Sequence, residues 1–168
     1  MALTVKRTGF GQVEPNHLSG IVTGQIYAQL PANKDIDVLE QGQFAKYDYA
    51  NGEVNFTGAG EFMLVYNEEK LYDERAQHHK DFALQKKDFT EGVMTPRLIK
   101  TNVGDIYTTN TIKGADSNDG ISLSVGDKLG VNAQGYLEKD VEGNLVFQVV
   151  KEYTMPDGQP GVKIQRIA

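Results

Sequence analysis

Cysteine and tryptophan are both absent from this chain of 168 residues, and histidine occurs only three times. Without cysteine, disulfides, thiolate metal sites and cysteine nucleophiles are excluded, and the chain suits synthesis in a reducing cytoplasm. Without tryptophan, the chain also lacks the largest aromatic side chain for stacking on flat ligands such as sugar rings. The composition alone therefore excludes every site that depends on cysteine or on tryptophan.

Basic charge and long apolar runs are also scarce. The chain has 17 Lys and Arg against 23 Asp and Glu, a net charge of -6, whereas nucleic-acid binding needs a basic surface that displaces counterions from phosphates. The longest apolar runs, such as Met63–Tyr66, have about four residues, far short of the roughly 20 that span a membrane. Residues 1–9 contain no apolar stretch of signal-peptide length. We expect neither a nucleic acid nor a membrane as partner.

No motif for catalysis or for a cofactor is present in the sequence. It has no GxxxxGK phosphate loop and no GxSxG nucleophile elbow. Residues 116–120 resemble a calcium loop, but they have five residues where the pattern needs six, and no glutamate closes the loop. His78 and His79 are adjacent, a spacing that directs side chains apart on a strand, and they lie in a charged, solvated stretch. We predict no enzyme activity, no catalytic or metal-binding residues and no cofactor.

Short apolar runs separated by turn residues dominate the rest of the chain and predict an all-β fold. The 18 glycines exceed the average share of about 7%. Asn51-Gly52 predicts a hairpin with a type I′ turn, and residues 156–160 predict a wider hairpin loop with Asp157-Gly158 at its tip. Residues 67–91 are charge-rich and fit either a short helix or a long exposed loop. Strands at near-regular spacing indicate a small β-barrel or β-sandwich.

The chain divides into two parts by composition. Residues 1–34 are punctuated by glycine and proline and have no helical period, which predicts an extended N-terminal arm. A first strand pair of the main domain is the alternative for this segment. Residues 35–168 are expected to form the β domain, or two small β subdomains over 35–100 and 101–168.

An ordered series of turns and strands runs through the C-terminal 50 or so residues, at 124–131, 135–137, 147–150 and 161–164. This series resembles the small β modules of the capsid decoration (cement) proteins of tailed bacteriophages. Residues 39–46 are similar to openings seen in phage head proteins. These features are turns and strands, and none of them is a catalytic or ligand-binding motif.

The resemblance implies a structural virion protein that is made in the host cytoplasm and binds the outside of the head. Its implied partners are the major capsid protein and copies of itself, as a homo-oligomer on the capsid lattice. An extended arm would suit this role, because a strand added to another chain's sheet edge satisfies exposed backbone groups with little sequence specificity. The residues that we expect to bind the partner in this way are Thr4, Val5, Lys6, Ile26, Tyr27 and Ala28.

Two alternatives remain open on the sequence. The protein could belong to another part of the virion, namely the neck, the tail or the shell itself. It could instead be a ligand-binding or carbohydrate-binding β module, for which the tyrosines to test are Tyr47, Tyr49, Tyr66 and Tyr72.

Overall fold

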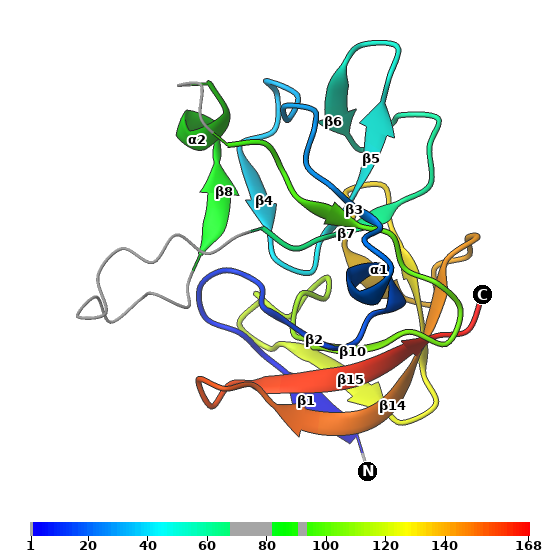
Figure 1. The fold of residues 1–168 in the computed structure, drawn as a ribbon. Coiled ribbons are helices and arrows are strands. Elements are labelled where there is room, and N and C mark those ends of the chain that lie inside the picture. Colours follow the sequence, from blue (N-terminus) through cyan, green and yellow to red (C-terminus); the bar gives the residue numbers. More distant parts are fainter. Residues whose placement is uncertain (1, 68–81, 91–93) are drawn as a thin grey trace.

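The computed structural model describes residues 2–67, 82–90 and 94–168 and confirms an all-β fold (Figure 1). Two short helices accompany the strands in this part of the chain. The elements are β1 (Ala2–Val5), β2 (Val13–His17), α1 (Ser19–Val22), β3 (Ile26–Tyr27), β4 (Val38–Glu40), β5 (Phe44–Asp48), β6 (Glu53–Asn55), β7 (Met63–Val65), β8 (Ala83–Gln85), α2 (Lys86–Thr90), β9 (Leu98–Ile99), β10 (Ile106–Thr109), β11 (Ile121–Ser124), β12 (Lys128–Val131), β13 (Leu137–Lys139), β14 (Val146–Thr154) and β15 (Pro160–Arg166).

The largest sheet is six-stranded and antiparallel, in the order β13-β12-β14-β15-β10-β2. Its spine is the hairpin of β14 and β15, whose loop has Gly158 at φ 89°, a conformation that glycine adopts without strain. A parallel bridge between Ile112, just after β10, and Leu137 of β13 draws the two sides of this sheet together. The sheet therefore curls into a small, nearly closed barrel.

Apolar side chains inside this curl form the first of two core clusters, which we call the barrel core. The rings of Phe147 and Tyr107 meet edge-to-face, with centroids 5.8 Å apart, and Phe44 from β5 packs on Phe147 at 5.5 Å. The buried members are Val5, Leu18, Phe44, Leu64, Ile99, Tyr107, Ile112, Ala115, Leu123, Leu129, Leu137, Leu145, Phe147, Val149, Val162 and Ile164. Residues from the N-terminal half of the chain thus complete a core built mainly by the C-terminal half.

A second sheet has five short strands in the order β3-β9-β7-β5-β6, and β4 pairs separately with β8. In Figure 1 these strands lie above β2, β10, β14 and β15. They enclose a second core cluster, which we call the upper core, with buried members Ala32, Ile36, Leu39, Ala45, Tyr47, Val54, Met63, Val65, Leu84 and Leu98.

The predicted hairpin at Asn51-Gly52 is present, but its turn differs from the prediction. Strands β5 and β6 pair with Asp48 opposite Glu53, so four residues connect them and not two. Gly52 has a positive φ of 68° whereas Asn51 does not, which rules out a type I′ turn. The Asp48 carboxylate accepts the backbone N–H of Ala50 and of Asn51, and it stabilises this longer connection.

The N-terminal segment is not an extended arm, and here the expectation was wrong. β1 pairs with β11, β2 pairs with β10, and β3 pairs with β9. Val5, Arg7 and Leu18 are buried. The alternative of folded strands describes this segment, because its three strands pair with strands that lie more than 70 residues away in the chain.

Only part of the charge-rich region 67–91 can be compared with the prediction. Residues 68–81 and 91 lie outside the described residues, and so do His78 and His79. The rest contains β8, which pairs with β4, and the short helix α2, where Asp88 accepts the backbone N–H of Gln85 at the helix start.

Candidate interaction surface

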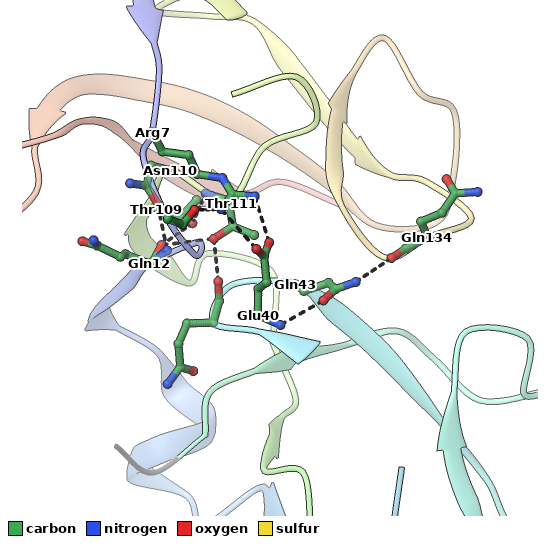
Figure 2. A network of polar contacts seen from close by, with 10 residues as sticks. Arg7, Gln12, Glu40, Gln43, Thr109, Asn110, Thr111 and Gln134 are labelled. Carbon is green, nitrogen blue, oxygen red and sulfur yellow. Dashed lines mark hydrogen bonds and ion pairs between the residues drawn. The ribbon is translucent and has the colours of Figure 1, made fainter. Parts of the chain in front are cut away.

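A buried polar network joins the N-terminal segment to the strands of both cores (Figure 2). Its centre is a bidentate ion pair: Arg7 Nη1 and Nη2 donate to Glu40 Oε1 and Oε2 at 3.1 and 2.9 Å. Both side chains are more than nine-tenths buried. Tyr136 also donates to Glu40, and burial, followed by the negative charge of Glu40, raises the pKa of Tyr136 well above its usual value. The Glu40 carboxylate is therefore held by hydrogen bonds from both Arg7 and Tyr136.

Hydrogen bonds continue the network along the segment after β1. The Gln12 backbone N–H donates to Asn110 Oδ1 at 2.8 Å, and Thr109 Oγ1 donates to the Gln12 carbonyl at 2.7 Å. On the other side of the ion pair, the Gln43 side chain accepts the Glu40 N–H and donates to the Gln134 carbonyl. Most of these groups satisfy one another, although Arg7 Nε and Asn110 Nδ2 have no hydrogen-bond partner among the described residues. The network therefore positions the N-terminal segment against both cores.

Three exposed large apolar side chains lie in α1 and in the β9–β10 turn that is hydrogen-bonded to it, while others, such as Tyr49 and Val125, are exposed elsewhere. Val22 is 88% exposed and Ile21 42%, and Val103, in the turn between β9 and β10, is 66% exposed. We call these three residues the α1 patch. Large exposed apolar patches with polar surroundings mark protein–protein or membrane interaction sites and ligand-binding grooves.

Two loops carry the α1 patch and are fastened to each other. Asp105 accepts the Ser19 N–H at 3.1 Å and the Asn102 N–H at 2.8 Å, and Asn102 Nδ2 donates to Ser19 Oγ at 2.8 Å. Gly20 packs against the backbone of Lys100, and a Cβ at position 20 would lie 2.5 Å from the Lys100 carbonyl oxygen. The patch is therefore presented by a fixed backbone, which lowers the entropy lost on docking.

A cavity of about 420 Å³ adjoins α1 and is lined by residues 15–19, 21, 22, 104 and 105. Its walls include the β2 edge of the large sheet. Shape and apolar character together suit an inserted side chain of a protein partner.

Three tyrosines form a second exposed feature in the upper core. Tyr27 meets Tyr47 edge-to-face at 5.8 Å, and Tyr49 stacks on Tyr47 at 5.5 Å with 12° between the ring planes. Tyr49 is 72% exposed while Tyr47 is buried. Of the other tyrosines singled out from the sequence, Tyr66 packs against the barrel core and Tyr72 lies outside the described residues.

The residues predicted to bind a partner are split between two sheets. Thr4 and Val5 belong to β1 and Lys6 follows it, whereas Ile26 and Tyr27 form β3, at an edge of the five-stranded sheet, with Ala28 exposed after it. The fold does not bring the two groups into one site. Their role as partner-binding residues stays a prediction.

The α1 patch was missed by sequence reasoning. Ile21-Val22 stands between glycines in a segment with no period, so nothing local distinguished an exposed pair from the start of a buried strand.

In the described ranges, no group of three or more His, Asp or Glu side chains is placed to hold a metal ion. The Asp116–Asp119 turn is largely exposed. No helix in the described part of the chain is long and apolar enough to cross a membrane. In comparisons with known proteins, no family model, no curated protein and no solved structure matches this chain.

Proposed function

We propose that this chain is a structural protein of a tailed-phage virion, an auxiliary or decoration protein that binds the capsid exterior and stabilises it. The α1 patch is the observation that carries the proposal. A surface this apolar on a chain this acidic favours a specific protein partner, because desolvating Val22, Ile21 and Val103 stabilises only a complex that covers them.

The setting of the patch supports binding to a repetitive lattice. Every capsid subunit presents the same acceptor surface, and a binder with a preformed contact loses little conformational freedom at each copy. Asp105, Asn102 and Ser19 supply that preformed geometry. The major capsid protein is the partner proposed here, and neighbouring copies of this chain would lie beside it on the lattice.

Co-sedimentation with capsids assembled from the major capsid protein of the same genome tests the proposal. We expect saturable binding at a fixed ratio per capsid subunit, and Val22→Asp should weaken it at least about tenfold, as a central apolar contact does. The matched control is Val125→Asp, an exposed valine in a different turn, which should bind as the wild type does. Absence of saturable binding by the wild-type protein would contradict decoration and favour the neck, the tail or the shell itself.

A second candidate function rests on the exposed ring of Tyr49. A stacked tyrosine that shows its outer face to solvent is a platform for a sugar ring, as a carbohydrate-binding module needs. Screening the protein on an oligosaccharide array, with Tyr49→Ala as the matched variant, tests it. Binding that disappears in the variant would establish this function, and an array without signal would dismiss it.

A further inference from the structure

The sheet edges of this fold differ in how well they are protected against another chain. β2 carries Pro15 and a register shift opposite β10, two devices that block strand addition. The outer edge of β6 is occupied by residues 31–33, which exchange backbone hydrogen bonds with Val54 at 2.8 Å. The outer edge of β13 is met by Ile112 and by Lys113, whose N–H donates to the Leu137 carbonyl.

β1 and its partner β11 are both four-residue edge strands without such protection. In β11, however, the outward N–H and C=O of Ser124 are already bound by Asp127, so the freer edge in the described residues is that of β1. β1 pairs only with β11, and its four residues carry no charge and no proline. No backbone hydrogen bond from residues 2–6 to anything but β11 is found in the described chain. An uncharged edge with free backbone groups is a template for pairing.

The hydrogen bonds at the end of β11 fix which residues of β1 face outward. Ser124 gives its N–H to Asp127 Oδ2, at 2.8 Å, and its carbonyl accepts the Asp127 N–H, at 3.0 Å. Ser124 therefore does not use these groups to bind Ala2 opposite it. Hydrogen-bonded pairs alternate along an antiparallel ladder, so Leu3 and Val5 pair with β11, and Ala2 and Thr4 direct their N–H and C=O groups away from it.

We propose that β1 pairs with β1 of a second copy of this chain, antiparallel and around a two-fold axis at Thr4. A two-fold axis at Thr4 gives every outward-facing residue of this edge a hydrogen-bonded partner, whereas an axis at Leu3 or Val5 would leave one of them without a partner. At this axis Thr4 faces its own copy and forms both hydrogen bonds with it. Ala2 of each copy then faces Lys6 of the other, which extends the same ladder at both ends.

The proposed occupant is a second copy because this edge is complementary to itself. The pairing places no like charges opposite each other: the Lys6 ammonium is bound by the Asn118 carbonyl of its own chain at 2.7 Å. It also joins the two-stranded sheets of the two copies into one four-stranded sheet in the order β11-β1-β1-β11. The dimer deepens the proposed function by naming one contact between copies, but it requires no capsid.

Sedimentation equilibrium of the free protein, without capsids, tests the pairing. We expect the wild type to approach twice the chain mass of 18.6 kDa with rising concentration. Thr4→Lys and Thr4→Glu should each raise the dimer dissociation constant about tenfold or more, because like charges then face each other across the axis. An equimolar mixture of the two variants should recover the dimer, which loss of folding could not produce.

Ser122→Lys is the matched control, since Ser122 is exposed and lies directly opposite Thr4 but one strand further from the axis. It should dimerise as the wild type does. A wild type that stays monomeric at every concentration would overturn the proposal, and so would a dimer indifferent to both Thr4 variants. Either result would leave capsid binding through the α1 patch to be decided by co-sedimentation alone.

Discussion

The barrel core and the upper core are both enclosed by antiparallel strands, but the strands differ in length and only the sheet of the barrel core nearly closes on itself. The barrel core rests on the nine-residue β14 and the seven-residue β15, and its sheet nearly closes on itself. The upper core uses strands of two to five residues. Long paired strands satisfy their own backbone, whereas short ones depend on neighbouring loops and side chains. The comparison predicts that the barrel core sets global stability and that the upper core depends on it.

Phe147→Ala should have the largest effect of the changes that test this comparison. Its ring contacts Tyr107 within the barrel core and Phe44 at the boundary with the upper core. We expect the free energy of unfolding to fall by about 4 kcal/mol, from lost burial and a residual cavity. Urea unfolding measures the change, and amide exchange should show both cores losing protection together.

Leu84→Ala is the corresponding change in the upper core, where Leu84 is fully buried in the β4–β8 pair. We expect a loss of about 2–3 kcal/mol, with increased amide exchange confined to the upper core. Equal loss of protection in both cores would show that the two clusters unfold as one unit.

Glu40→Gln probes the ion pair at the junction and should lower the free energy of unfolding by about 3 kcal/mol, because Arg7 becomes a buried charge without its partner. The double variant Glu40→Leu with Arg7→Met should recover most of that loss, since neither charge is then buried alone. Denaturant unfolding of the single and double variants checks this. A double variant no more stable than Glu40→Gln would mean that the pair contributes more than charge neutralisation.

Asp127→Ala should have the smallest effect, a loss of about 1 kcal/mol at neutral pH. The hydrogen bond from the Ser124 N–H, followed by that from Lys139, lowers the pKa of Asp127. A lowered folded-state pKa stabilises the fold above the unfolded value of about 3.9 and loses that effect as pH falls through the folded value. Unfolding curves from pH 7 down to about 2 should therefore converge for variant and wild type.

Asp48→Ala is the matched change in the upper core, because hydrogen bonds from Asn51 and Asn55 likewise lower the pKa of Asp48. It should show the same convergence with acidification. A difference between variant and wild type that persists at low pH would mean that the carboxylate acts through packing and not through its charge.

Local signals in the sequence were enough for the hairpins and for the fold class. Asp157-Gly158 and Asn51-Gly52 both mark real turns, because glycine relieves a backbone restriction wherever it occurs. The pairing of Ala2 with Ser124 could not be predicted in this way, since no local pattern records which distant strand completes an edge. The same limit applies to the candidate site: α1, which carries Val22, is held in place by the hydrogen bond from Ser19 N–H to Asp105, far along the chain.

Pairing of β1 with β11 and of β2 with β10 has a consequence for biosynthesis. Both N-terminal strands leave the ribosome long before their partners, and at about 5–20 residues per second they wait roughly 5–20 seconds for them. During that interval the apolar side chains of the N-terminal segment that belong to the barrel core stay exposed, because the strands that cover them are not yet made. Strands β10 and β11 then act as the template on which the first residues fold, so a translation product that stops before them would be prone to aggregate.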